Sequence, residues 1–103
     1  YNVATDSTSS GTVTLDFDGG QLIQLTSSLA GDITFAASNM GAGKVLSVKM
    51  VNGGSSRTLT FPTNWKFVGA KPTTIAASKT AVLALTAYGT AEADVVAAWA
   101  VES

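Results

Sequence analysis

Short runs in which apolar and polar residues alternate constrain the fold of this chain more than any other feature. In residues 12–17, Val13, Leu15 and Phe17 fall on one face and polar residues fall on the other. A period of two is typical of a β-strand that buries one face. The alternation predicts further strand segments, inward residues in parentheses, at 21–26 (Ile23, Leu25), 32–35, 44–51 (Leu46, Val48, Met50), 57–61, 65–67, 71–75, 80–88 (Ala81, Leu83, Leu85, Ala87) and 95–101 (Val95, Ala97, Trp99, Val101).

Segments with turn composition separate these runs. Residues 18–20 (Asp-Gly-Gly) and 52–56 (Asn-Gly-Gly-Ser-Ser) are rich in glycine, which accepts the positive φ of tight turns. Pro62 cannot donate to a ladder, and it therefore predicts the end of the run 57–61. We expect 12–17 and 21–26 to pair as a hairpin. Because short strands follow one another at close intervals, the expected fold class is all-β: an antiparallel, jelly-roll-like β-sandwich of seven to eight short strands.

One domain is expected, at residues 12–103, because the chain has the length of a single domain. Residues 1–11 are mostly small and polar, and we interpret them as a linker or lead-in segment. The chain begins Tyr-Asn-Val, without Met or a secretory leader, and we expect it to be a fragment of a longer protein.

Two alanine-rich segments, 76–87 and 90–100, admit a helical alternative, since alanine is the best helix former. Val82, Val95, Val96 and Trp99 favour strands instead, and the alternation there has a period of two. We therefore predict strands in both segments.

The composition excludes several classes of function. The chain of 103 residues has no His and no Cys, which removes the commonest base at neutral pH, thiol nucleophiles and the usual zinc ligands. Its formal charge is only -1, so it lacks the basic character of nucleic-acid-binding proteins. No run approaches the roughly 20 apolar residues of a membrane-spanning helix. We expect no enzymatic activity, no cofactor, no metal, no nucleic-acid partner and no membrane insertion.

Three short motifs have a chemical and a structural interpretation. The sequence of residues 41–44 (Gly-Ala-Gly-Lys) is an incomplete phosphate loop, and 16–19 (Asp-Phe-Asp-Gly) is an incomplete calcium loop. Glu92 and Asp94 have the residue types of a glycosidase carboxylate pair. In each case we favour the structural interpretation: a turn, a hairpin and solvated side chains, respectively.

Five residues are candidates for a ligand site or an interface: Arg57, Asn64, Trp65, Lys66 and Trp99. A tryptophan anchors a core or an interface when it is buried and stacks on sugar rings when it is exposed. Trp99 lies in an apolar alternation and is expected to be buried, whereas Trp65 follows a loop and is the better candidate for exposure. Arg57, the only arginine, is either solvated or makes a bidentate bond to a carboxylate or carbonyl.

About two thirds of the chain, from Thr34 onward, resembles a module of bacteriophage tail-fibre, tailspike, head-fibre and decoration proteins. The resemblance rests on residues 53–62 (Gly-Gly-Ser-Ser-Arg-Thr-Leu-Thr-Phe-Pro), then Trp65-Lys66, Gly69, Pro72-Thr73 and a late pair of strands. Two positions depart from the family pattern: Phe61 stands where Trp is familiar, and Thr80 where Asp often begins the penultimate strand.

The resemblance implies a compact, non-catalytic structural or adhesive module on the virion surface, often a homotrimer. Its partners would be copies of itself and other virion proteins. A chain with only 13% charged residues also has little to keep identical faces apart, which favours assembly. The alternative is a carbohydrate- or host-receptor-binding module in which an exposed Trp65, with Asn64 and Lys66, binds a host surface glycan.

Overall fold

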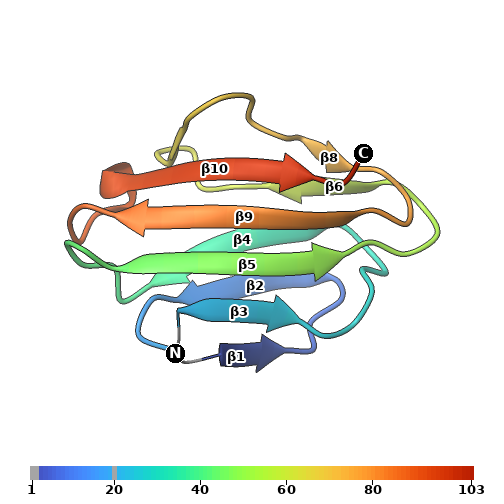
Figure 1. Cartoon of the computed structure of the whole chain (residues 1–103), viewed down its shortest axis with the longest axis horizontal. Coiled ribbons are helices and arrows are strands. Elements are labelled where there is room, and N and C mark those ends of the chain that lie inside the picture. The colour runs from blue at the N-terminus through green and yellow to red at the C-terminus, as the bar shows by residue number, and fades with distance from the viewer. Residues whose placement is uncertain (1–2, 20) are drawn as a thin grey trace.

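The computed structural model describes residues 3–19 and 21–103, which form an all-β fold of two mixed sheets (Figure 1). The strands are β1 (Val3–Asp6), β2 (Gly11–Asp16), β3 (Leu22–Leu25), β4 (Ile33–Ser38), β5 (Val45–Val51), β6 (Arg57–Thr60), β7 (Lys66–Phe67), β8 (Thr74–Ile75), β9 (Thr80–Ala87) and β10 (Val95–Val101). A 3-10 turn, η1 (Glu92–Asp94), precedes β10. Among the described residues, no helix has the length and apolar character needed to cross a membrane.

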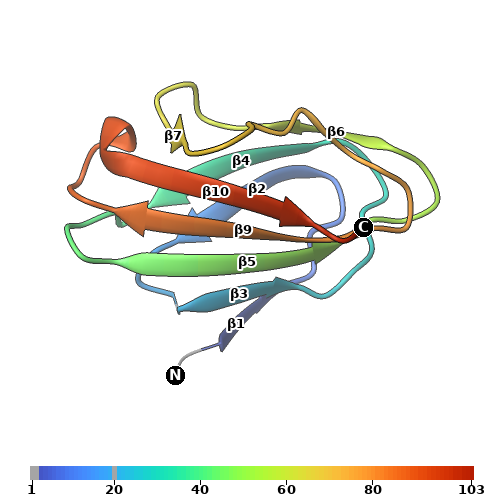
Figure 2. The ribbon, with the colours of Figure 1, turned by 45° about the horizontal axis from the view of Figure 1, so that its top comes forward.

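The two sheets lie in separate layers (Figure 2). One has the strand order β1-β3-β5-β9-β10-β7, and the other has the order β2-β4-β6-β8. From β1 to β8, each strand lies in the sheet opposite to its predecessor. Among the first six strands, those that are two apart along the chain are neighbours: β1, β3 and β5 pair in parallel, as do β2, β4 and β6. Antiparallel pairing is confined to β5–β9, β9–β10 and β6–β8, so the expected antiparallel fold is wrong for most of the N-terminal half.

The predicted hairpin of residues 12–17 and 21–26 does not form. β2 pairs with β4 in the four-stranded sheet, whereas β3 pairs with β1 and β5 in the six-stranded sheet. The turn after β2 is closed by a hydrogen bond from the Gly19 N–H to the Asp16 carbonyl, at 3.0 Å. A hairpin and a crossing between two layers both need glycine and aspartate at such a turn, and both bury alternate residues, so the sequence pattern does not distinguish them. Gly20, the last residue of the predicted turn at 18–20, lies outside the described residues.

The segment expected to be a lead-in contains a strand. Val3–Asp6 forms β1, which pairs in parallel with β3, from Val3 opposite Leu22 to Asp6 opposite Leu25. A strand of four mostly small residues is ordered by its hydrogen bonds to β3 rather than by its own composition. Tyr1 and Asn2 lie outside the described residues.

Residues on the facing sides of both sheets form one apolar core. The inward positions predicted for β2, β5 and β9 are confirmed: Val13, Leu15, Leu46, Val48, Met50, Ala81, Leu83, Leu85 and Ala87 are all buried. The two alanine-rich segments are strands, as predicted, and each contributes to this core. In β10 the alternation weakens toward the C-terminus, because Val95 and Ala97 are buried, Trp99 is half-buried and Val101 is exposed.

Candidate functional site

Aromatic residues of the part of the chain from Thr34 onward form a cluster centred on Phe61. The Phe61 ring stacks on Phe35 with 5.0 Å between centroids and an interplanar angle of 7°. Phe67 and Trp99 approach it edge-on, at 4.9 Å and 6.5 Å, and Trp65 is tilted against it at 6.1 Å. The cluster joins β4 and the end of β6 in one sheet to β7 and β10 in the other. It is therefore a packing centre between the layers.

Trp65 lies inside this cluster and is more buried than Trp99, the reverse of the relative exposure expected from the sequence. Only 4% of its surface is accessible, and its indole N–H donates a hydrogen bond to the Glu92 carboxylate. The turn before it directs the ring inward, because the Trp65 backbone N–H bonds to the Pro62 carbonyl at 3.2 Å. With its ring faces covered, Trp65 offers no platform on which a sugar could stack.

The carboxylates of Glu92 and Asp94 serve local structure. Glu92 accepts the indole N–H of Trp65, which ties η1 to the aromatic cluster. Asp94 Oδ2 accepts the Ala91 backbone N–H at 3.2 Å, and the Asp94 N–H returns a bond to the Ala91 carbonyl at 3.0 Å. The sequence predicted that both side chains are solvated. Instead, Glu92 holds η1 against Trp65, and Asp94 closes the turn with Ala91. Sequence reasoning missed the tether, whose partners are 27 residues apart.

The remaining candidate residues do not converge on one site. Asn64 and Lys66 are exposed beside the buried Trp65, and Trp99 is half-buried on the rim of the aromatic cluster. Arg57 begins β6, at the opposite end from Phe61, and pairs through its backbone register with Ile75. Its side chain is half-buried, and its Nε has no hydrogen-bond partner among residues 3–19 and 21–103. The bidentate bond to a carboxylate does not form within that part of the chain.

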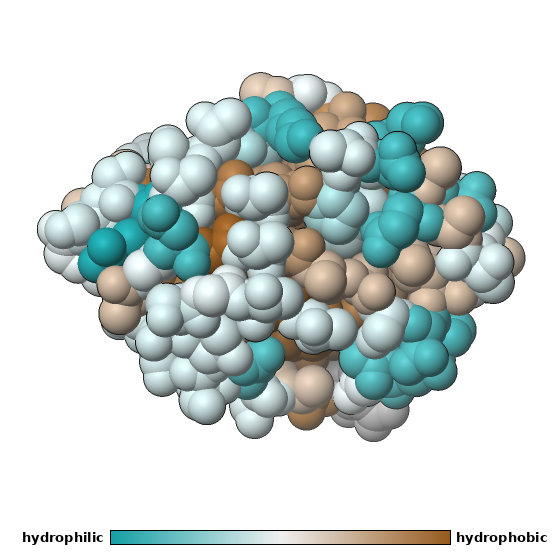
Figure 3. Space-filling view, turned by 180° about the vertical axis from the view of Figure 1, so that it is seen from behind, coloured by the Kyte–Doolittle hydropathy of each residue, from teal (hydrophilic) through white to brown (hydrophobic). Residues whose placement is uncertain are grey.

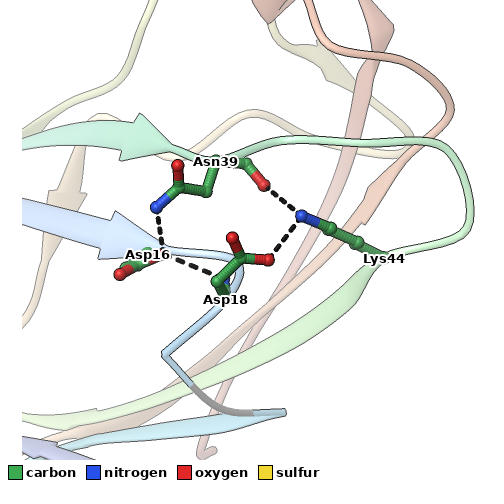
Figure 4. A network of polar contacts seen from close by, with 4 residues as sticks. All are labelled: Asp16, Asp18, Asn39 and Lys44. Carbon is green, nitrogen blue, oxygen red and sulfur yellow. Dashed lines mark hydrogen bonds and ion pairs between the residues drawn. The ribbon is translucent and has the colours of Figure 1, made fainter.

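A network of polar side chains connects the turns that follow β2 and β4 (Figure 4). Asp16 Oδ1 accepts a hydrogen bond from the Asn39 side-chain amide at 2.8 Å and another from the Asp18 backbone N–H at 2.8 Å. Lys44 Nζ forms an ion pair with Asp18 and donates to the Asn39 carbonyl at 2.9 Å. Asn39 has a φ of 56°, a left-handed conformation that asparagine tolerates better than most residues.

This network gives a structural role to two of the incomplete motifs. Asp16 and Asp18 belong to the segment that resembles a calcium loop, and Lys44 ends the one that resembles a phosphate loop. Here the Lys44 ammonium supplies the positive charge that Asp18 faces, and amide N–H groups satisfy Asp16. The network therefore fastens two crossings between the layers to one another.

The hydrogen bond from Asn39 is the main reason that the pKa of Asp16 lies below the usual value of 3.8 for aspartate, with the Asp18 backbone N–H second and the Lys44 charge a minor cause. A pKa depressed by folding stabilises the protein above the unfolded-state pKa, and this stabilisation is lost as the pH falls through the folded-state pKa. We expect Asn39→Gly, which keeps the left-handed backbone, to raise the Asp16 pKa toward its usual value. Carboxyl-carbon NMR titration measures this directly.

Lys44→Ala is the matched comparison for that titration. It removes the minor cause and is expected to raise the Asp16 pKa less than Asn39→Gly does. The wild-type chain should also lose more stability than Asn39→Gly as the pH falls through the Asp16 pKa, because the variant lacks the largest cause of the depressed pKa and has less of this contribution to lose. An Asp16 pKa unchanged by Asn39→Gly would contradict this account.

A second polar centre, around Asn52, was not predicted beyond its place in a turn. Asn52 is a buried polar residue in the core region, with 2% of its surface accessible. Its side-chain amide donates to the carbonyls of Ser55, Ile75 and Ala76 at 2.8, 3.1 and 3.0 Å, and its Oδ1 accepts the Gly53 N–H at 2.8 Å. The amide thus holds the turn after β5 against the end of β8. An asparagine directly after an apolar strand and before two glycines is the sequence signal for such a role.

No group of three potential metal ligands and no pocket occurs among residues 3–19 and 21–103. The polar clusters described above can hold loops together, and their donors and acceptors are paired with one another. Comparison of the chain with protein-family models, with curated proteins and with solved structures found no match.

Proposed function

We propose that this chain is a non-enzymatic structural module of a bacteriophage virion, a fibre, spike or capsid-decorating domain on the particle surface. It assembles there with copies of itself, as a homotrimer, and with other virion proteins. In this proposal the fold is a β-sandwich related to jelly rolls, in which parallel crossings between the layers replace the expected N-terminal hairpin.

One observation carries the proposal: the residues of the resembling block are used for packing between the layers. Phe61 forms the centre of the aromatic cluster, and Trp65 is fixed by Glu92. The Asn52 amide holds the glycine-rich turn at the start of the block. A motif that builds a scaffold supports a module whose work is assembly and presentation. The glycan-binding alternative loses its main support, because it depended on an exposed Trp65.

The oligomeric part of the proposal is tested by light scattering on a sizing column at neutral pH and moderate salt. A homotrimer is expected to have a molar mass of about three times the chain mass of 10.4 kDa. A mass equal to that of one chain at all concentrations tested would contradict it.

The location is tested separately on particles. Antibodies raised against the purified chain are expected to label intact virions of the phage that encodes it, as seen by immunogold electron microscopy. Label that remains with host-cell material and is absent from purified particles would overturn the virion assignment whatever the oligomeric state.

A further inference from the structure

Asn52 and Gly53 form the only Asn-Gly pair in the sequence. The backbone nitrogen that follows an asparagine can attack the side-chain amide carbon, and glycine hinders this attack least because it has no Cβ. Asparagine is accordingly one of the thermolabile residues of proteins. The other three asparagines precede Val, Met and Trp, whose side chains hinder the attack. Asn52 is therefore the asparagine of this chain with the greatest intrinsic tendency to deamidate.

The fold requires both members of this pair. The Asn52 side-chain amide donates to three backbone carbonyls around the turn, a role that needs its two N–H groups. A Cβ on Gly53 would lie 2.8 Å from the Leu29 carbonyl oxygen, a distance that real Cβ atoms essentially never show. The close approach of the turn to Leu29 thus imposes glycine at the position where it makes the preceding asparagine reactive.

Hydrogen bonds hold the reacting groups in place in the folded chain. The Gly53 N–H is directed at Asn52 Oδ1, at 2.8 Å, and at the Leu29 carbonyl, at 3.3 Å. The Gly53 carbonyl accepts the Ser78 N–H at 2.8 Å, and the Asn52 N–H donates to the Lys79 carbonyl at 2.9 Å. Ring closure turns the Gly53 peptide and the Asn52 amide toward each other, and it therefore requires that several of these bonds break together.

Burial adds to this protection. The turn lies at the end of the sandwich where β5 finishes, at the right of Figure 1. Its residues Gly54, Ser55 and Ser56 are exposed, whereas only 2% of Asn52 is accessible. Pale, near-neutral residues and hydrophilic ones make up most of the surface at this end, at the left of Figure 3, which views the molecule from behind. Water and hydroxide therefore reach the rim of the turn but not the amide beneath it.

We propose that Asn52 is a deamidation site that reacts only when the domain unfolds, and that its reaction makes unfolding irreversible. In the unfolded chain the Gly53 nitrogen gives its proton to hydroxide and bonds to Asn52 Cγ. The Cγ–Nδ2 bond breaks, and the amide nitrogen takes a proton from water and leaves as ammonia. A water molecule then opens the five-membered imide at either carbonyl, which leaves an aspartate or an isoaspartate at this position.

Neither product can rebuild the turn. Both present an oxygen in place of Nδ2 to the carbonyls of Ser55, Ile75 and Ala76, and isoaspartate also lengthens the backbone by one carbon. Buried polar groups left without partners destabilise the folded state. Chemical modification of an unfolded chain that prevents refolding turns a reversible equilibrium into a one-way loss. The inference is independent of the proposed function, because it concerns this turn alone.

Peptide mapping by mass spectrometry tests the site. Trypsin cleaves after Lys49 and Arg57 and releases residues 50–57, and the exposed Asn64, in residues 58–66, is the internal control. The unfolded fraction of a native protein is on the order of 10⁻³ or lower, so we expect Asn52 to deamidate at least about a hundredfold more slowly in native buffer than in guanidinium chloride above the unfolding midpoint. Asn64 should stay largely unmodified in both. Equal rates at Asn52 in the two conditions would overturn the proposal.

Two variants separate the chemistry from the fold. In guanidinium chloride, Gly53→Ala is expected to slow the modification many-fold, because the added Cβ hinders the attack whether or not the chain can fold. In native buffer, Phe61→Ala is expected to speed it, since loss of the aromatic cluster raises the unfolded fraction without touching the turn. An unchanged rate in Phe61→Ala would contradict the requirement for unfolding.

Refolding measures the irreversible step. Wild-type chains are held in guanidinium chloride for increasing times, diluted into native buffer and followed by tryptophan fluorescence. The fraction that regains the native signal is expected to fall in step with the deamidated fraction of residues 50–57. Deamidated chains that refold as completely as unmodified ones would overturn the proposal, even if the site and its protection were as expected.

Discussion

Replacing Phe61 by alanine is expected to lower the free energy of unfolding by about 3–5 kcal/mol. The substitution leaves a cavity between the layers and removes ring contacts with Phe35, Phe67 and Trp99. Aromatic pairs add about 0.5–1.5 kcal/mol each beyond the area that they bury. Because a domain of this size has a total stability of about 5–15 kcal/mol, the variant should fold but unfold at a much lower denaturant concentration. Urea unfolding followed by tryptophan fluorescence measures the change.

Phe67→Ala is the matched control for this prediction. Phe67 belongs to the same cluster, but it is half-buried at the rim, with Lys71 Nζ 5.8 Å from the ring centroid. Its removal should cost less than half as much, since the exposed site can fill with water and relax. Equal losses for Phe61→Ala and Phe67→Ala would show that Phe61 is not the centre of the cluster.

The sequence contained enough information to place most strands and their buried faces. Val13 and Leu15 in β2, and Leu46, Val48 and Met50 in β5, are buried as the period of two predicts. This success has a simple cause: each residue's side of a strand depends only on its immediate neighbours in the chain. The alanine-rich strands followed from the same local pattern, even though intrinsic propensity pointed toward helix.

The partners of those strands could not be predicted in the same way. The parallel neighbour of β2 is β4, and the Asp16 pair with Asn39 that secures their ends spans 23 residues. Such contacts depend on which layer the chain enters after each turn, and a glycine-rich turn allows either choice. β1 was missed for a related reason, because its order depends on the ladder offered by β3.

The candidate residues were predicted without the contacts that the structure gives them. Trp65 and Trp99 were candidates for a ligand site or an interface, and both pack against Phe61. The loop position of Trp65 suggested an exposed ring, but a turn bond to Pro62 and an acceptor on Glu92 direct the ring inward. Alternation shows neither contact, because the bond to Pro62 is a backbone bond within a turn and Glu92 lies 27 residues further along the chain.

Asn52 provides the second large effect, because its buried amide serves several backbone groups at once. Asn52→Asp keeps the shape of the side chain but replaces the donor group with an acceptor oxygen facing the carbonyls of Ser55, Ile75 and Ala76. Each buried polar group left unpaired costs about 1–3 kcal/mol, and a buried charge costs more. We expect a loss of about 3 kcal/mol or more at neutral pH, measured by urea unfolding.

Asn64→Asp is the control, since Asn64 is exposed and the same substitution there should change stability by no more than about 0.5 kcal/mol. The comparison isolates burial and hydrogen bonding from the chemistry of the substitution. It also tests the architecture, because Asn52 joins the end of β5 in one layer to the end of β8 in the other. Equal stabilities for the two variants would mean that this turn is held by its backbone alone, and the Asn52 amide would then have no part in fastening the layers.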